Sequence, residues 1–145
     1  MLKRLMGTTN DVSLTILRVV LGAVFFAHGA QRMLGWFGGV GFHGAMEGFA
    51  QTGMPAPIAF LIICAQFFGG LGLMAGLLTR IASLGVAGLM IGAIFMVHMP
   101  YGFFMNWTGS QKGEGIEFHL LALAMAAALL LRGAGAFSMD RSLTK

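Results

Sequence analysis

The residues of this sequence that could do chemistry are a few ionisable side chains set in long apolar stretches. Three histidines and one glutamate fall at the ends of such stretches: His28, His98, His119 and Glu117. If the stretches cross a membrane, all four lie at one depth. Imidazole and carboxylate groups placed there could bind a metal ion, bind a haem, or relay protons to a quinone. Ionisable groups inside a membrane span are costly, so each is a candidate functional residue.

Helical phase divides this set. At about 100° per residue, Glu117 and His119 lie about 200° apart on one helix and cannot face the same point. We expect Glu117 to face the interior, because apolar residues continue its face. These are Leu120, Leu121 and Ala124. The alternative for all four residues is that their side chains only lie among the lipid headgroups and form no site.

One face of the first apolar stretch carries two arginines and two glycines. At helical spacing, one stripe collects Arg18, Gly22, Phe25, Gly29 and Arg32. Glycines let a neighbouring helix approach closely, so we expect this stripe to face the interior of a helical bundle. The alternative is that the two arginines extend to the headgroups from opposite ends of the helix.

Gln66 is the one strongly polar residue of the second apolar stretch. It lies about 12 Å below the outer end of a helix that rises 1.5 Å per residue. It could line a binding pocket, or it could make an interhelical hydrogen bond worth about 1 kcal/mol.

Soft ligands suited to Cu(I) gather in the outer segments. They are Met96, His98, Met99 and Met105, with His43 and Met46 in a second segment. The chain has 12 methionines, so such neighbours are expected by chance, and we predict no metal site. The single cysteine, Cys64, has no partner for a disulfide or a CxxC redox pair.

The elements that must position these residues follow from composition. The chain has 145 residues, of which 57% are hydrophobic and 10% are charged. A soluble domain carries about 25% charged residues, so the solvent of this chain is largely lipid. The apolar stretches do not alternate as the strands of a barrel must, and each is close to the roughly 20 residues of a spanning helix. We predict a single all-α domain over 1–145, an integral membrane four-helix bundle with spans at about 14–34, 58–78, 81–99 and 116–132.

Topology follows from the basic residues, which are enriched in cytoplasmic loops. Four spans put both termini and the Thr79–Arg80 turn on one side, which we predict to be cytoplasmic. That side holds Lys3, Arg4, Arg80, Arg132, Arg141 and Lys145, and the other holds only Arg32 and Lys112. The first span has no convincing cleavage site, so we expect it to be retained. The basic residues form no cluster, which argues against a nucleic-acid partner.

The outer loops, about 35–57 and 100–115, hold most of the aromatic residues, including Trp107, and resemble an interfacial belt. Small-residue motifs predict close helix packing, since Gly72 and Gly76 form one GxxxG and Gly88 and Gly92 form another. Either face could also support a homo-oligomer.

The order and spacing of several short motifs resemble the DoxX/DoxD family of small bacterial membrane proteins. The resemblance runs from Leu17 to Arg141. Its motifs are Leu17-Arg18, Leu21-Gly22, Phe26-Ala27-His28-Gly29, Arg32, Gly53-Met54-Pro55, Gln66-Phe67-Phe68-Gly69-Gly70, Gly76-Leu77-Leu78-Thr79-Arg80, Val97-His98, Asn106-Trp107, Glu117-Phe118 and the run from Gly133 to Arg141.

The resemblance implies a multi-pass protein of the bacterial inner membrane, often an oxidoreductase subunit. Related DoxD proteins form the membrane part of a thiosulfate:quinone oxidoreductase, and other members are tied to oxidative stress. The sequence departs from the family pattern at two positions: the family often has an acid in place of Gln66 and a lysine in place of Arg32. The first departure argues against proton transfer at Gln66 and leaves a hydrogen bond to a quinone carbonyl open.

Our leading hypothesis is a redox-linked membrane subunit that binds quinone in the outer half of the bundle. His28 and His98 would hydrogen-bond or exchange protons with the ring oxygens, and Glu117 would orient a histidine or pass protons to the outside. Arg18 and Arg32 would balance charge, and Gln66 and Trp107 would line the site. The chain has no nucleotide-binding loop and no haem-attachment motif, so electrons are expected from a partner protein. The alternatives are a non-catalytic scaffold or assembly factor and, less favoured, a transporter of a small molecule or metal.

Overall fold

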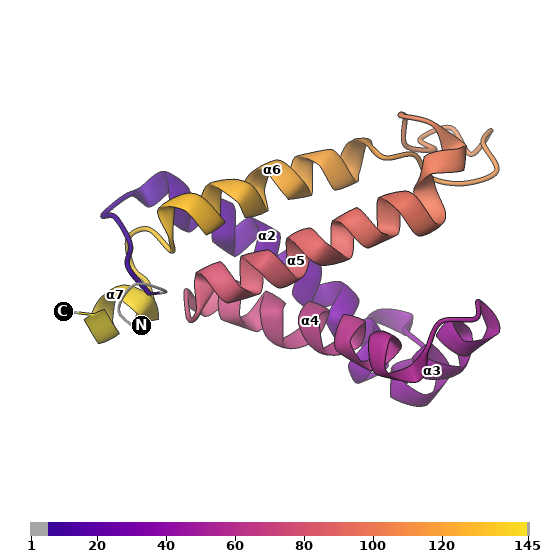
Figure 1. The fold of residues 1–145 in the computed structure, drawn as a ribbon, viewed down its shortest axis with the longest axis horizontal. Helices are drawn as coiled ribbons and strands as arrows, with labels where there is room; N and C mark the ends of the chain where they lie inside the picture. The colour runs from indigo at the N-terminus through magenta and orange to yellow at the C-terminus, as the bar shows by residue number, and fades with distance from the viewer. Residues whose placement is uncertain (1–5, 145) are drawn as a thin grey trace.

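The computed structural model describes residues 6–144, and these residues fold into helices without strands, as the sequence predicts. The four long helices α2, α4, α5 and α6 lie side by side (Figure 1). The short helix α7 and the start of α2 lie at one end of the bundle, and α3 and the 102–116 loop lie at the other, here called the outer end. In chain order the elements are α2 (Val12–Met33), η1 (Trp36–Gly38), α3 (Gly41–Gln51), α4 (Ala56–Ala75), α5 (Thr79–Ala93), η2 (Ile94–His98), η3 (Met99–Tyr101), α6 (Glu117–Arg132) and α7 (Met139–Thr144).

Three helical segments are long and apolar enough to cross a membrane: Val12–Met33, Ala56–Ala75 and Thr79–Tyr101. Helix α6 is shorter, with 16 residues. The fourth crossing and the cytoplasmic position of the termini therefore stay predictions. Lys3, Arg4 and Lys145, on which the predicted orientation partly rests, lie outside the described residues.

Helices α4 and α5 form an antiparallel hairpin, but its turn lies at 76–78, earlier than the predicted Thr79–Arg80 turn, and Thr79 is already helical. Gly76 ends α4 in a left-handed conformation with φ of 67°, which a glycine adopts without strain. The backbone N–H of Leu77 bonds to the carbonyl of Gly72, and that of Gly76 bonds to Leu73. This pair of bonds is the Schellman motif, which satisfies the last carbonyls of a helix.

The stripe predicted on α2 does face the interior, and its glycines make the closest helix contact. A Cβ on Gly29 would lie 2.4 Å from the backbone nitrogen of Phe67, and one on Gly22 would lie 2.8 Å from the carbonyl oxygen of Gly70. Close approach thus joins α2 to α4. In the first GxxxG motif, Gly76 caps the end of α4 and does not pack against another helix. In the second, a Cβ on Gly88 or Gly92 would meet nothing within 4 Å. Neither motif makes a close helix contact through both of its glycines.

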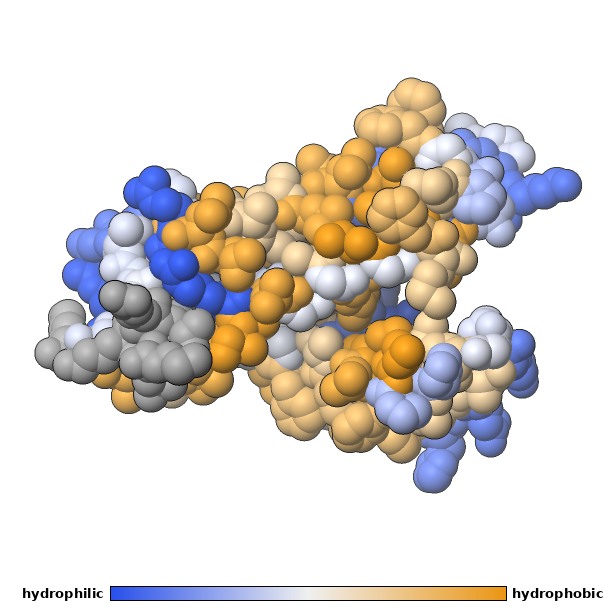
Figure 2. All heavy atoms as spheres, viewed as in Figure 1, coloured by the Kyte–Doolittle hydropathy of each residue, from blue (hydrophilic) through white to orange (hydrophobic). Residues whose placement is uncertain are grey.

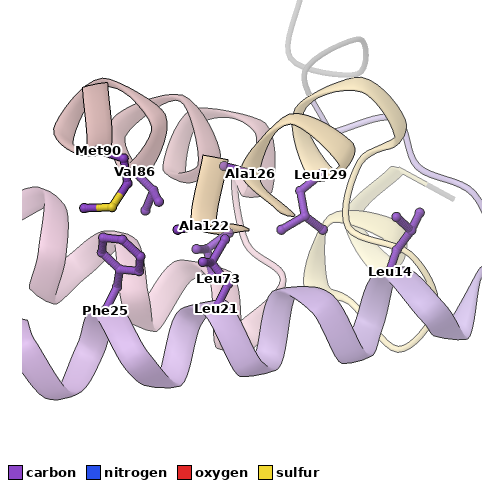
Figure 3. Packing of buried hydrophobic residues seen from close by; sticks show 9 residues of the cluster. All are labelled: Leu14, Leu21, Phe25, Leu73, Val86, Met90, Ala122, Ala126 and Leu129. Carbon is purple, nitrogen blue, oxygen red and sulfur yellow. The ribbon is translucent and has the colours of Figure 1, made fainter. Parts of the chain in front are cut away.

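The apolar core lies where α2, α4, α5 and α6 meet (Figure 3). Ala122 and Ala126 of α6 are buried in it, and their small side chains bring α6 close to its neighbours. The buried members are Leu14, Leu21, Phe25, Leu73, Val86, Met90, Ala122, Ala126 and Leu129.

The expectation that 35–57 is a loop is wrong, because this segment contains η1 and α3. Helix α3 contacts both α2 and α4 and buries Ala45. Its glycines lower intrinsic helix propensity, so its helicity depends on tertiary packing that the local sequence does not reveal.

Candidate functional site

A cavity of about 830 Å³ lies in the outer half of the molecule, bounded by α2, α3, α4, α5, η2 and α6. Figure 2 shows the molecule hollowed here, with hydrophilic atoms visible deep between apolar walls. Most of the lining is aliphatic, aromatic or glycine. Its polar members are His28, Arg32, Gln66, His98, Glu114 and His119.

Arg32 and Gln66 meet on the wall of this cavity. A guanidinium nitrogen (Nη1) of Arg32, on α2, donates a hydrogen bond to Oε1 of Gln66, on α4. Since a guanidinium only donates, the amide must turn its oxygen toward Arg32, and this leaves the Nε2 hydrogens for a further acceptor.

The guanidinium of Arg32 has neutral partners. Besides the amide of Gln66, it lies over the ring of Phe49, with 5.7 Å from Cζ to the ring centroid. Phe49 belongs to α3, so this helix, missed in the sequence, helps to position the cation. A cation held by an amide and a ring in an apolar cavity favours a ligand with acceptor oxygens or negative charge.

The rings of His98 and His119 contact each other in a tilted arrangement, with 4.1 Å between ring centroids and an interplanar angle of 45°. Nδ1 of His98 lies 2.7 Å from the carbonyl oxygen of Glu114. A carbonyl only accepts, so this nitrogen carries a hydrogen, and Nε2 of the neutral ring is then an acceptor. His119 is 5% exposed, and its Nδ1 has no hydrogen-bond partner among residues 6–144. The pair therefore presents ring nitrogens that can accept or release protons.

The end of α5 positions His98. From Ile94 to His98 the helix widens into a π-helical turn, after which Met99–Tyr101 form a short 3-10 helix. A π turn holds more residues than an α turn, so it shifts the rotational position of His98. Such turns occur frequently at functional sites. The sequence places His98 at the end of a span, but it gives no sign of this change in helix type.

The expected role of Glu117 is wrong in its choice of helix face. The buried face of α6 is the other one, with His119, Ala122, Ala126 and Leu129, while Leu121 is 67% exposed. Glu117 instead organises the 102–116 loop, since its Oε1 accepts hydrogen bonds from the backbone N–H of Met105 at 2.8 Å and from Nε1 of Trp107 at 2.9 Å.

Trp107 therefore contacts Glu117 rather than the cavity, and it is 82% exposed. Glu114 is half-buried and lines the cavity, and its Oε2 accepts a hydrogen bond from the backbone N–H of Asn106 at 2.6 Å. The spacing of Ala122 and Ala126 after His119 is the sequence signal that could have identified the correct face.

Arg18 lies at the opposite end of the bundle and is not part of the cavity lining. Its side chain is 2% exposed and donates to backbone carbonyl oxygens at the end of α4 and in the segment after α6. The distances are 2.9 Å to Ala134, 3.0 Å to Leu73 and 2.6 Å to Phe137, with Met74 at 2.5 Å and Ala136 at 3.4 Å. Arg18 joins three parts of the fold instead of extending to headgroups.

His28 lies one helical turn before Arg32 and contributes to the same wall, at an exposed position. The structure thus brings together four of the predicted residues, His28, Arg32, Gln66 and His98, and leaves Arg18, Trp107 and Glu117 elsewhere. Across residues 6–144, no group of three or more His, Cys, Asp or Glu side chains is placed to hold a metal ion.

Comparisons with known proteins match this chain to one family. The family model described as DoxX matches residues 13–99. A Bacillus subtilis protein named "Putative oxidoreductase CatD" is 30% identical over 135 residues, covering 93% of this chain and 90% of its own length. An Escherichia coli protein named "Inner membrane protein YqjF" is 29% identical over 140 residues, covering 97% and 98%. The search of solved structures found no match.

Proposed function

The chain belongs to the DoxX family, and we propose that it is a membrane subunit of a quinone-linked redox system that holds the quinone ring in the outer cavity. Its apolar helices and its similarity to a named inner membrane protein place it in the bacterial inner membrane as a multi-pass protein. The similarity to a protein named as an oxidoreductase supports redox work in general terms.

The main support for the proposal is the pair of hydrogen-bond donors, Arg32 and Gln66, in a cavity whose lining is mostly apolar. Quinone carbonyls are acceptors on an apolar ring, and the guanidinium and the Nε2 of Gln66 supply donors to match them. The volume of about 830 Å³ is ample for a substituted ring, since ligand cavities run to roughly 1,000 Å³.

The histidines supply the proton chemistry. Reduction of a quinone to a quinol takes two electrons and two protons. His28, His98 and His119 line the cavity and can deliver protons to the ring oxygens, while Nε2 of His98 can accept a hydrogen bond from a quinol hydroxyl. In this proposal a partner protein supplies the two electrons.

A binding measurement tests this assignment. The purified protein in mild detergent is titrated with a fully substituted benzoquinone, and the dissociation constant is compared with that of Arg32→Met. Loss of a charged hydrogen bond costs about 1.5–3 kcal/mol, so we expect Kd to rise roughly tenfold or more. Arg132→Met is the matched control, because Arg132 is exposed at the far end of α6.

Two results would contradict the proposal. One is that no benzoquinone binds the wild-type protein, which leaves the non-catalytic scaffold as the better account. The other is that Arg32→Met and Arg132→Met bind the ring as tightly as the wild type does.

A further inference from the structure

The hairpin of α4 and α5 is closed near its turn and open farther out. A Cβ built on Gly72 would lie 3.8 Å from Cβ of Ala82, and one on Gly85 would lie 3.8 Å from Cβ of Ala65. Beyond this point on α5, a Cβ on Gly88 or Gly92 would meet nothing within 4 Å. The two helices therefore separate over their outer halves, as Figure 1 also shows, and the cavity opens between them.

A second hollow continues from this opening along the contact line of α4 and α5. It measures about 430 Å³ and shares Leu61, Ala65 and Gly85 with the cavity, so the two adjoin. We call it the seam groove. Apart from the thiol of Cys64, its side chains are hydrocarbon. The lining is completed by Cys64, Phe68, Gly69, Gly72, Leu77, Leu78, Ile81 and Ala82.

The rim of the seam groove carries exposed apolar side chains on two candidate membrane-spanning helices. Both helices belong to segments long and apolar enough to cross a membrane. Large apolar side chains on the rim are exposed, with Leu61 at 64% and Phe68 at 59%. In a membrane-spanning segment such residues lie against lipid tails, so a molecule in the groove meets lipid rather than water.

We propose that the ligand of this site is an amphiphile dissolved in the bilayer, whose oxygenated ring lies in the outer cavity and whose apolar tail leaves between α4 and α5 and lies in the seam groove. This inference rests on the proposed function and adds the substrate class, a lipid-tailed quinone rather than a water-soluble one. The donors of Arg32 and Gln66 fix the head, and the hydrocarbon of the groove accommodates the tail.

The single cysteine offers a direct readout, because Cys64 lines the seam groove and not the cavity. The full chain is placed in lipid nanodiscs, and the rate at which N-ethylmaleimide alkylates Cys64 is measured with two probes. One is a fully substituted benzoquinone without a tail, and the other is the same ring with a decyl tail. We expect the tailed probe to slow alkylation at least about fivefold and the tail-less probe to leave it unchanged.

A pair of variants sharpens the test. Gly69 lies in the groove with open space at its Cβ position, so Gly69→Phe fills the groove. Gly48, on α3, also has open space and lines neither hollow, so Gly48→Phe is the matched control. Misfit in an apolar pocket costs roughly tenfold or more. We expect Gly69→Phe to weaken binding of the tailed probe by that factor and to leave binding of the tail-less probe unchanged. Gly48→Phe should change the binding of neither probe.

The outcomes separate this inference from the function beneath it. If both probes bind equally in both variants, or if the tailed probe binds without protecting Cys64, the tail does not lie in the groove. A bilayer lipid tail would then be the occupant of the groove, and the ring assignment would stand. If neither probe binds the wild-type protein, the proposed function itself fails.

Discussion

Asp140 of α7 caps the first turn of α5, because its Oδ2 accepts a hydrogen bond from the backbone N–H of Thr79 at 2.9 Å. Its Oδ1 accepts from Leu78 at 2.7 Å, and the carboxylate is 1% exposed. The backbone N–H of Asp140 in turn donates to the carbonyl of Gly76 at 2.8 Å. The C-terminal segment thus holds the α4–α5 turn from which the two walls of the cavity diverge.

Loss of this cap should destabilise the protein. Asp140→Ala removes two hydrogen bonds to backbone N–H groups, and one lost cap alone costs about 1 kcal/mol. We expect the free energy of unfolding in mixed SDS micelles to fall by about 2 kcal/mol. Asp140→Asn keeps one acceptor oxygen, so its free energy of unfolding should fall by less. Equal stability of Asp140→Ala and the wild type would show that the cap is not needed.

Arg18 should behave as a structural residue. Replacing it with methionine leaves buried carbonyls of α4 and of the segment after α6 without a donor. We expect Arg18→Met to lower the free energy of unfolding by about 3 kcal/mol or more. Lysine cannot reproduce the planar arrangement of donors and should recover only part of this.

Ligand binding distinguishes this role from the one expected from sequence. Folded Arg18→Lys should bind benzoquinone as the wild type does, because Arg18 does not line the cavity. If Arg18→Lys raised the dissociation constant as far as Arg32→Met does, at unchanged stability, Arg18 would have to be assigned to the binding site.

The contact between α2 and α4 should not accept a methyl group at Gly29. A Cβ added at position 29 would lie 2.4 Å from the backbone nitrogen of Phe67, and the backbone of α4 cannot shift without a cost in free energy. We expect Gly29→Ala to lower the melting temperature, at a cost of about 1–3 kcal/mol. Gly48→Ala, where the added carbon meets nothing within 4 Å, is the matched control. The interface would be looser than described if both variants melted alike.

Glu117 should hold the 102–116 loop. Glu117→Leu removes the acceptor for Met105 and Trp107, so the loop should open more often. Lys112 is an exposed trypsin site in this loop, and we expect cleavage there to accelerate roughly tenfold. Glu47→Leu, on the exposed face of α3, should leave the rate unchanged. An unchanged rate in Glu117→Leu would mean that other contacts order the loop.

The helices of this fold could be predicted because each is a long apolar run, and the interior face of α2 could be predicted because its glycines and arginines recur at helical spacing. Asp140 could not be found this way, since a residue of α7 caps α5 and no local motif precedes Thr79.

In the candidate site, residue type alone marks Arg32, Gln66, His28 and His98. Their arrangement depends on how α2 and α4 are rotated against each other and on the π turn before His98, which no local pattern encodes. The prediction that Glu117 rather than His119 faces the interior is wrong because it uses leucines to mark the interior face. In a membrane, leucines face lipid as readily as they face the core, and the small residues Ala122 and Ala126 mark the packed face.

Arg32 and Gln66 are proposed to donate hydrogen bonds to a quinone oxygen, and the carbonyl stretching frequency of a bound, carbonyl-labelled benzoquinone reports on these bonds. Infrared difference spectra of the wild-type protein should show that frequency lowered from its value in detergent alone, since hydrogen bonding weakens the carbonyl bond. The lowering should shrink in Arg32→Met and in Gln66→Leu and persist in Arg132→Met. A frequency equal to that of the free quinone, or one lowered identically in all four proteins, would show that Arg32 and Gln66 do not donate to the quinone oxygen.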